Sequence, residues 1–382
     1  MNVLVAIDSF KGSLSSMEAG NAVRDAVLRL DKDAKVTVKP LADGGEGTVE
    51  ALASGFDSET IHLTVRGPLL KPVNAKYCIL KERNTAVIEM ASAAGITLID
   101  ASERNPFVTT TYGVGELISD AIRRGCRRFI IGIGGSATND GGTGMLSALG
   151  FAFLDRNKRP VDPGAIGMKD LAEIRTDHAM PALKDCVFHI ACDVTNPLCG
   201  ENGCSAVFAP QKGATPEMID NMDIWLKNYA QAAKKVSEKA DENHAGAGAA
   251  GGLGFAFLSF TNATLKPGIE IVLEQTGIEN DIKGADIVVT GEGRLDSQTV
   301  MGKAPAGVAK LAKKYGKTVI AFSGCVTEDA EICNEHGIDA YFPIVRGVTT
   351  LEEALKHDNA YKNLSAAAYQ VFRLITAGNR QA

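Results

Sequence analysis

The sequence predicts an α/β protein with mostly parallel β-sheets and helices on both sheet faces. Short, continuous apolar runs alternate with helix-like segments along the chain. The clearest apolar runs are Phe129–Ile133, Val187–Ala191, Ile287–Thr290 and Val319–Phe322. A strand that is apolar along its whole length is typical of a parallel sheet covered on both faces. Their alternation with helical segments indicates the α/β class.

The N-terminal part of the chain predicts a strand, a helix and a second strand. Val3–Ile7 is apolar and rich in β-branched residues, as a first strand would be. Met17–Leu30 has helical periodicity, and Ser15 precedes Glu18 at the spacing of an N-terminal capping box. Val36–Leu41 predicts the next strand, and a further helix begins after it.

The length of 382 residues predicts two domains or one large α/β unit. Turn-forming residues interrupt the chain near Gly67-Pro68 and again at Lys283–Asp286, just before a new strand. We therefore expect a discontinuous domain made from both chain ends, residues 1–70 and 285–382. Residues 71–284 would form a second α/β domain inserted between them.

Composition narrows the class of protein. A net charge of −6 argues against nucleic acid as a partner. The uncharged stretch Ala245–Leu265 has the length of a membrane span, but its Gly/Ala-rich first half and later polar residues favour a glycine-rich loop before a buried segment. The N-terminus has no basic secretion signal, and the eight cysteines form no C-x-x-C pair. We expect a cytoplasmic protein without a membrane partner, and a homo-oligomer is left open.

Polar turns come after the predicted strands, and ligands of open α/β sheets bind at the carboxyl ends of strands. Asp8–Ser13 supplies a carboxylate, hydroxyls and Lys11 after the first strand, and a solvated loop is the alternative. After the second predicted strand, Ala42–Thr48 combines three glycines with Asp43 and Glu46. Carboxylates in such a turn suit Mg²⁺ or substrate hydroxyls, and a capped helix start is the alternative.

The Gly134–Gly144 segment is the strongest single signal. Its glycines, hydroxyls and backbone N–H groups suit phosphate oxygens, although no Walker A lysine is present after it. A rival interpretation is the dinucleotide fingerprint G-x-G-x-x-A over 132–137, with Asp155 as the ribose ligand. That fingerprint requires a helix to begin at once, and residues 139–142 would break it within a turn.

Chemically useful residues also come after two later strands. Asp193 ends one strand, where it is either a catalytic carboxylate or a turn cap, and Lys212 lies further on in a segment that can reach a phosphate. Glu292 lies between two glycines, and Arg294 can bind a carboxylate bidentately or form a surface turn with Asp296. Backbone donors, carboxylates and cations together are what phosphoryl transfer requires.

Together these motifs resemble those of the type I glycerate kinases over nearly the full chain. The matching segments are Asp8–Ser13, Ala42–Thr48, Gly132–Gly144, Cys192–Gly200, Phe208–Gly213 and Gly291–Ser297. Val194-Thr195 departs from the Asp-rich form of its segment, which leaves the role of Thr195 open.

The resemblance implies a two-domain protein with a cleft and a Rossmann-like domain formed from both chain ends. It also implies ATP, Mg²⁺ and D-glycerate as ligands, and 2-phosphoglycerate as product. A kinase of another hydroxy acid, a dinucleotide-dependent oxidoreductase and a non-catalytic sensor of sugar acids are the alternatives.

Each candidate residue receives an expected role. The expected catalytic residues are Asp193, which orients or deprotonates the hydroxyl, and Lys11 and Arg294, which neutralise charge or clamp the carboxylate. The expected nucleotide-binding residues are Gly134, Gly135, Ser136, Thr138, Asn139, Asp140, Gly141 and Gly142. The expected substrate-binding residues are Asp8, Ser9, Asp43 and Arg66. The expected metal ligands are Asp193 and Glu292.

Overall fold

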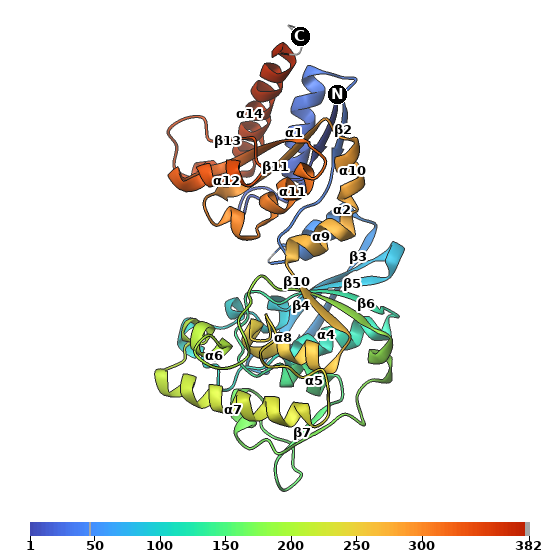
Figure 1. Ribbon diagram of the computed structural model, residues 1–382, viewed down its shortest axis with the longest axis vertical. Coiled ribbons are helices and arrows are strands. Elements are labelled where there is room, and N and C mark those ends of the chain that lie inside the picture. The colour runs from blue at the N-terminus through green and yellow to red at the C-terminus, as the bar shows by residue number, and fades with distance from the viewer. Residues whose placement is uncertain (46, 379–382) are drawn as a thin grey trace. The chain divides into compact units, whose positions relative to one another are not determined.

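The computed structural model describes residues 1–45 and 47–378 of the chain, which divides into two units (Figure 1). Unit 1 contains Met1–Asp43, Glu50–Phe56 and the chain from Ile269 onward. Unit 2 contains Gly44–Val49 and Asp57–Gly268. The chain ends therefore meet in one unit, but its bounds differ from the expected residues 70 and 285.

Strand pairing explains the difference in bounds. β3 (Ser58–Arg66) pairs along its whole length with β4 (Pro72–Leu80), so both strands belong to the sheet of unit 2. At the other boundary, α9 (Gly268–Thr276) and α10 (Ile278–Gly284) precede the first returning strand of unit 1. α10 contacts β1 (Asn2–Val5), which ties it to unit 1.

Unit 1 is built on a five-stranded sheet in the order β13-β12-β11-β1-β2, and every pair is parallel. Besides β1, its strands are β2 (Lys35–Val38), β11 (Ile287–Leu295), β12 (Thr318–Val326) and β13 (Ala340–Pro343). The chain moves from β1 outward to β2 on one side, and the later strands are added on the other. The topological switch point therefore lies between β1 and β11, where such sheets bind ligands.

Helices cover both faces of this sheet. α1 (Ser16–Leu30) and α14 (His357–Gly378) lie side by side on one face (Figure 1). Alternate strand residues pack against them, as the period of two in a strand requires: Val3, Val5, Ile7, Val289 and Phe322. On the other face, α10 contacts α11 (Ala304–Lys313), and α11 contacts β11 and β12.

The predicted start of α1 is confirmed. The Ser15 hydroxyl accepts the backbone N–H of Glu18 at 3.3 Å, and the Glu18 carboxylate accepts the N–H of Ser15 at 2.9 Å. This reciprocal pair satisfies two N–H groups that the first helical turn leaves without intrahelical partners.

Unit 2 contains a six-stranded sheet in the order β10-β9-β6-β5-β4-β3. Its other strands are β5 (Thr85–Glu89), β6 (Arg128–Gly132), β9 (Val187–Ala191) and β10 (Ala263–Lys266). Strands β5, β6, β9 and β10 are parallel, and β3, β4 and β5 are joined as antiparallel neighbours. A separate hairpin joins β7 (Ala152–Leu154) to β8 (Glu173–Arg175). The predicted class, α/β with mostly parallel sheets, is confirmed.

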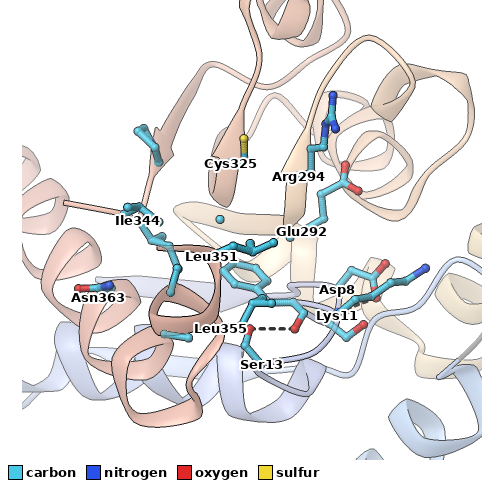
Figure 2. Close-up of a pocket in the computed structure, with 18 of the residues that line it drawn as sticks. Asp8, Lys11, Ser13, Glu292, Arg294, Cys325, Ile344, Leu351, Leu355 and Asn363 are labelled. Atoms are coloured by element: carbon cyan, nitrogen blue, oxygen red, sulfur yellow. Dashed lines mark hydrogen bonds between the residues drawn. The ribbon is translucent and has the colours of Figure 1, made fainter. Parts of the chain in front are cut away.

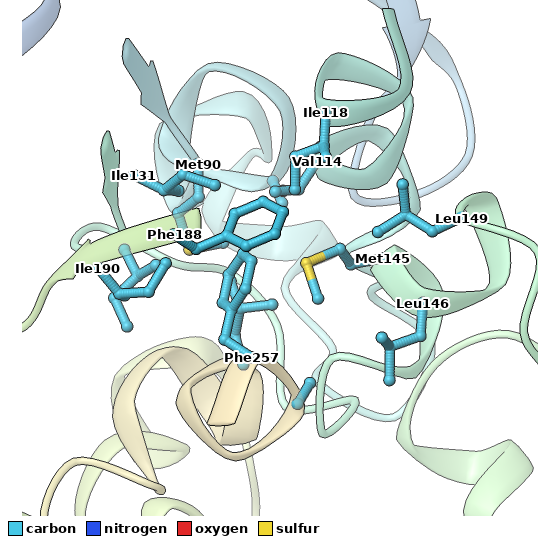
Figure 3. Packing of buried hydrophobic residues seen from close by; sticks show 14 of the residues in the cluster. Met90, Val114, Ile118, Ile131, Met145, Leu146, Leu149, Phe188, Ile190 and Phe257 are labelled. Carbon is cyan, nitrogen blue, oxygen red and sulfur yellow. The ribbon is translucent and has the colours of Figure 1, made fainter. Parts of the chain in front are cut away.

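The core of unit 2 is rich in aromatic side chains. The rings of Phe129 and Phe188 stack at 4.7 Å between β6 and β9, and Phe257 packs on Phe188 at 5.7 Å. Figure 3 shows Phe188 and Phe257 close to Met145 and Val114 in this core. Val114, Met145 and Phe257 belong to α4 (Tyr112–Arg123), α5 (Thr143–Ala148) and α8 (Ala249–Phe260). Residues of α7 (Pro216–Lys234) join the same core.

The uncharged stretch Ala245–Leu265 forms α8 and most of β10. Within residues 1–45 and 47–378, no helix is both long enough and apolar enough to cross a membrane. The shorter helices of the chain are α2 (Thr48–Gly55), α3 (Ala91–Ala94), α6 (Cys204–Phe208), α12 (Ile332–Glu335) and α13 (Leu351–Leu355).

Candidate active site

A pocket of about 770 Å³ lies at the carboxyl ends of β1, β11, β12 and β13 in unit 1 (Figure 2). One end is charged, and its lining residues include Asp8, Lys11, Asp43, Glu292, Arg294 and Lys303. The other end is mainly apolar, and its lining residues include Ile344, Leu351, Ala354, Leu355, Ala360 and Asn363. Asp8 follows β1, while Glu292 lies within β11, which extends past the expected end at Thr290 to Leu295. Both residues line this one pocket.

Negative charge is concentrated at the charged end. Burial raises the pKa of Asp8 to about 7, with the neighbouring charge of Asp43 as the next largest cause and that of Glu292 as a smaller one. Burial also raises the pKa of Glu292. Carboxylates that raise one another's pKa in this way favour a cation in their midst.

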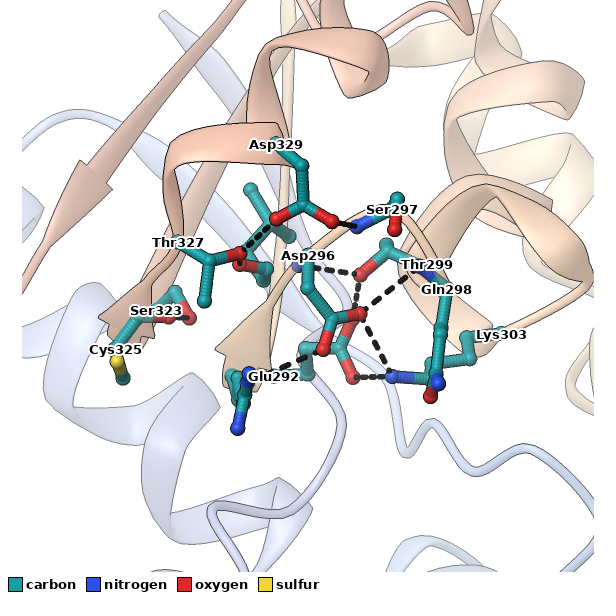
Figure 4. A network of polar contacts seen from close by, with 12 residues as sticks. Glu292, Asp296, Ser297, Gln298, Thr299, Lys303, Ser323, Cys325, Thr327 and Asp329 are labelled. Carbon is teal, nitrogen blue, oxygen red and sulfur yellow. Dashed lines mark hydrogen bonds and ion pairs between the residues drawn. The ribbon is translucent and has the colours of Figure 1, made fainter.

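A network of polar contacts fixes the turn after β11 (Figure 4). Glu292 accepts a hydrogen bond from the Thr299 hydroxyl at 2.6 Å, and Lys303 Nζ lies 3.7 Å from its second oxygen. Asp296 receives Lys303 at 3.4 Å and Arg294 at 3.2 Å. Arg294 thus forms the Arg–Asp turn of the alternative interpretation, yet its side chain is 65% exposed and also lines the pocket.

A second pocket of about 360 Å³ lies in unit 2 at the carboxyl ends of β6 and β9. Its polar lining comes from three segments: the start of the Gly134–Gly144 loop, the turn after β9, and the 210–212 turn. Its residues include Gly134, Gly135, Ser136, Asp193, Gln211 and Lys212. Asp193 Oδ1 accepts the backbone N–H of Gly268 at 3.1 Å, which orients the carboxylate.

Lys212 is the buried cation of this pocket. Its side chain is only 2% exposed, and Nζ donates to Ser136 Oγ at 2.8 Å and to the carbonyl of Thr138 at 2.7 Å. Burial lowers its pKa to about 8. The neighbouring groups Cys204 and Asp140 raise this pKa, but burial outweighs them. A desolvated amine held by neutral groups is costly to keep, which marks it as a functional candidate.

Asp140, an expected nucleotide-binding residue, is buried inside the loop and does not face the pocket. It is fully buried, and its carboxylate accepts the N–H groups of Thr111 at 2.8 Å, Gly142 at 3.1 Å and Gly144 at 3.2 Å. The Thr111 hydroxyl also donates to it at 2.9 Å. These bonds hold the loop in shape, while the carboxylate itself lies outside the pocket lining.

The other expected nucleotide-binding residues fall into two groups, those that line the pocket and those that lie behind it. Gly134, Gly135 and Ser136 line the pocket. Asn139 is buried behind them and donates to Ser205 Oγ at 2.9 Å. The remaining members, Thr138, Gly141 and Gly142, also lie outside the lining. The first turn of the loop therefore faces the pocket, and the remaining residues pack behind it.

Arg66, an expected substrate-binding residue, is absent from the lining of both pockets. It ends β3, and its guanidinium lies 4.4 Å from the Tyr112 ring centroid and 3.7 Å from the Glu116 carboxylate. The pairing of β3 with β4 carries Arg66 into unit 2. Glu46, the other carboxylate of the Asp43 turn, lies outside the described residues.

The dinucleotide fingerprint lacks its structural context. No helix begins at Ala137, and the next one after β6 is α5, which starts only at Thr143 and is short. Asp155 instead stabilises a hairpin turn: it accepts the N–H groups of Asn157 at 2.7 Å and Arg159 at 2.9 Å. Its carboxylate also pairs with the Arg159 side chain at 2.8 Å.

Comparison with known proteins finds a family match over almost the whole chain. A sequence model described as the glycerate kinase family matches residues 3–376. The chain belongs to the glycerate kinase family. It is therefore an enzyme, a kinase, and the resemblance seen in its strand-end motifs is confirmed.

Individual members of the glycerate kinase family match over their full lengths. The protein named glycerate 2-kinase of Escherichia coli K12 is 45% identical over 382 residues and covers 100% of both chains. The glycerate kinase of Bacillus subtilis 168 is 46% identical over 366 residues, which is 96% of each chain. A crystal structure described as glycerate kinase 2 of Salmonella typhimurium LT2 superposes with a TM-score of 0.93 at 44% identity, covering 100% of this chain and 99% of that one.

The donor set of unit 1 fits the Mg²⁺ expected of this family. Within the described ranges, no three His, Cys, Asp or Glu side chains form a ready metal cage. Mg²⁺ bound with a nucleotide needs only one or two protein carboxylates, since phosphates and water complete its shell. Asp43 and Glu292 both line the charged end of the pocket. The expected pair, Asp193 and Glu292, is divided between the two units.

Sequence reasoning missed the wall of the glycerate kinase pocket in unit 1 that comes after β13. This wall is the segment from Pro343 to Leu355, together with Asn363 on α14. It carries no glycine-rich or charged motif. The available signal was Thr350, which caps α13 by accepting the Glu353 N–H at 3.2 Å, after a strand end.

Proposed function

We propose that this enzyme transfers the γ-phosphoryl group of ATP to the 2-hydroxyl of D-glycerate, giving 2-phosphoglycerate and ADP. The observation that carries the proposal is the pocket of unit 2, where Lys212, the Gly134–Ser136 turn and Asp193 face one small cavity. A cation, backbone donors and a carboxylate are the groups that phosphoryl transfer uses. The family and the name of the Escherichia coli relative support the choice of substrate and hydroxyl.

The proposed step forms a bond between the 2-oxygen of glycerate and the γ-phosphorus and breaks the bond from that phosphorus to the β,γ-bridging oxygen. Asp193 orients the hydroxyl and accepts its proton. Lys212 and the N–H groups of Gly134–Ser136 stabilise charge on the phosphoryl oxygens. Because such transition states are loose, charge stabilisation and positioning contribute more than the base does.

The charged groups of unit 1 complete the proposal. Lys11 and Arg294 bind phosphate or carboxylate oxygens in the unit 1 pocket. Asp8 and Ser9, at the end of β1, contact the bound substrate or nucleotide. Asp43 and Glu292 would hold Mg²⁺, which supplies charge neutralisation for the β- and γ-phosphates.

The direct test incubates the protein with ATP, Mg²⁺ and D-glycerate and monitors the products by phosphorus NMR. A 2-phosphoglycerate signal is expected. A 3-phosphoglycerate signal would overturn the regiochemistry, and turnover of other hydroxy acids but not glycerate would overturn the substrate.

Asp193→Asn tests the proposed base. We expect kcat to fall about 10²-fold or more, since acid–base catalysis contributes on that scale. The Gly268 N–H can still be accepted by the amide oxygen, so stability should change little. Asp177→Asn, in an exposed turn of the same unit, is the control. A folded Asp193→Asn enzyme with near-normal kcat would remove Asp193 from this role.

A further inference from the structure

We infer that the unit 1 pocket is the nucleoside subsite, binding the adenine and ribose of ATP at its apolar end. The inference rests on the proposed ATP dependence but assigns the nucleoside to residues that no sequence motif marked. None of the Gly134–Gly142 residues expected to bind the nucleotide lines this pocket.

The polarity of the pocket matches a nucleotide and not a small acid. Figure 2 shows Asp8, Lys11, Glu292 and Arg294 at one side, and Ile344, Leu355 and Asn363 at the other. A purine has apolar faces and polar edges, and a polyphosphate is fully charged, so one nucleotide matches both ends. Glycerate is polar throughout and has no group for the apolar end.

Size favours the same occupant. The volume of about 770 Å³ lies within the range of pockets that enclose drug-sized ligands, roughly 300–1,000 Å³. A three-carbon acid would leave most of this volume filled with water against apolar side chains. The smaller unit 2 pocket, about 360 Å³ with Lys212 and Asp193 in its lining, suits small anionic groups better.

The position in the sheet orients the ligand. The charged groups come from the ends of β1 and β11, the two strands at the topological switch point. The apolar groups come from the end of β13, from α13 and from α14. Phosphates at the switch point and the base toward β13 agree with the general arrangement of ligands in open α/β sheets.

Asn363 gives the apolar end a group that can read a base edge. Its Oδ1 accepts a hydrogen bond from Arg346 Nε at 3.2 Å, which fixes the orientation of the amide. The amide NH₂ group is then available to donate to a purine ring nitrogen. An amide set among apolar side chains is the usual composition of a nucleobase-sized site.

The test measures ADP binding by calorimetry without glycerate, alongside the KM values for ATP and glycerate. Ala354→Trp places an indole in the apolar end, and we expect the Kd for ADP to rise about tenfold or more. Asn363→Ala should weaken ADP and reduce its preference over GDP. Leu374→Trp is the matched control, because Leu374 is 72% exposed on α14 outside the pocket lining. The KM for glycerate should change by less than about twofold in all three.

Each outcome decides the inference. Unchanged ADP affinity in Ala354→Trp and Asn363→Ala would overturn it, and so would a raised glycerate KM with normal ADP binding. If Ala354→Trp fails to fold by circular dichroism, Asn363→Ala carries the test. A wild-type protein that binds ADP, loses it on these substitutions, and yet does not phosphorylate glycerate would overturn the proposed function while leaving this subsite in place.

Discussion

Lys212 and Asp140 are two buried charges that the same loop treats in opposite ways. Asp140 accepts three backbone N–H groups and two hydroxyls, although burial still raises the pKa of its carboxyl. Lys212 donates to a hydroxyl and a carbonyl and lines a pocket. The first stabilises the loop and the second is available to a ligand, although both are buried.

The pKa of Lys212 predicts an alkaline limit to activity. Burial lowers this pKa to about 8, so the free enzyme should lose the proposed phosphate contact as pH rises through that value. We expect kcat/KM to fall above about pH 8. In Lys212→Arg the fall should move to higher pH, since guanidinium stays charged. Lys212→Met should lose about 10²-fold in kcat.

Stability should change with pH in the opposite sense. Between about pH 8 and 10.5, the folded protein releases the Lys212 proton while the unfolded chain still holds it. The free energy of unfolding should therefore gain a rising contribution across this window, which Lys212→Met abolishes. Urea unfolding at several pH values measures it. Lys227→Met, on an exposed helix face, is the control, and equal pH slopes in both variants would contradict the assignment.

Asp140→Ala should destabilise the fold strongly. The substitution leaves the buried N–H groups of Thr111, Gly142 and Gly144 without their acceptor, at a cost of roughly 3–5 kcal/mol. Asp155→Ala is the matched control, because Asp155 also accepts turn N–H groups but lies at a hairpin where water can replace it. Its loss of stability should be much smaller. Chemical denaturation would show the difference, and equal losses would argue against burial as the cause.

At the scale of elements, the start of α8 supports the glycine-rich loop. Ala250, Gly251 and Gly252 have positive φ angles there, which bends the chain into close contact with residues 138–141. A Cβ built on Gly251 would lie 2.1 Å from the Thr138 carbonyl, the same oxygen that Lys212 contacts. The two segments can approach this closely only without a side chain between them.

Gly251→Ala tests this contact, and Gly277→Ala is its control. Both glycines have similar φ angles, +68° and +62°, but a Cβ at Gly277 would meet nothing within 4 Å. Both variants carry the left-handed backbone cost of roughly 1–2 kcal/mol. Only Gly251→Ala should lose more stability and also lower kcat, since it displaces the acceptor of Lys212. Equal effects of the two substitutions on stability and kcat would contradict the packing argument.

At the scale of the molecule, each of the two sheets places one pocket at the carboxyl ends of its parallel strands. The sheets differ in the residues that their strand ends carry. Unit 1 combines acids and cations with an apolar wall, while unit 2 combines a backbone turn with Asp193 and Lys212. The chemistry expected of one enzyme is thus divided between two sheets that the chain builds separately.

Ligand stabilisation should separate the kinase from the oxidoreductase alternative. ADP with Mg²⁺ at about one hundred times its Kd should stabilise the folded protein by roughly 2.7 kcal/mol, seen as a higher Tm. NAD at the same concentration should leave the Tm unchanged, because no helix begins directly after β6 at the dinucleotide turn. A larger shift with NAD would favour the dinucleotide-dependent class.

The sequence by itself determined the α/β class, the apolar strands β1, β6, β9, β11 and β12, the capping box of α1 and the family. These features depend on residues that are close in sequence: apolar runs, a Ser-x-x-Glu spacing and glycine-rich turns. It also located Asp8, Asp193 and the 134–136 turn after strands, because a strand's end can often be read from its own residues. Glu292 instead lies within β11, which continues to Leu295 through pairing with β12.

Only the tertiary structure decided which of these residues share a pocket. Asp140 looked like a ligand in the loop, but contacts with the distant Thr111 make it a structural acceptor. The pairing of β3 with β4 assigns Arg66 to unit 2, which its local sequence did not indicate. The apolar wall beside Asn363 forms only when the chain after β13 folds over the ends of other strands. Strand pairing and burial join residues far apart in sequence, and local patterns carry no record of those contacts.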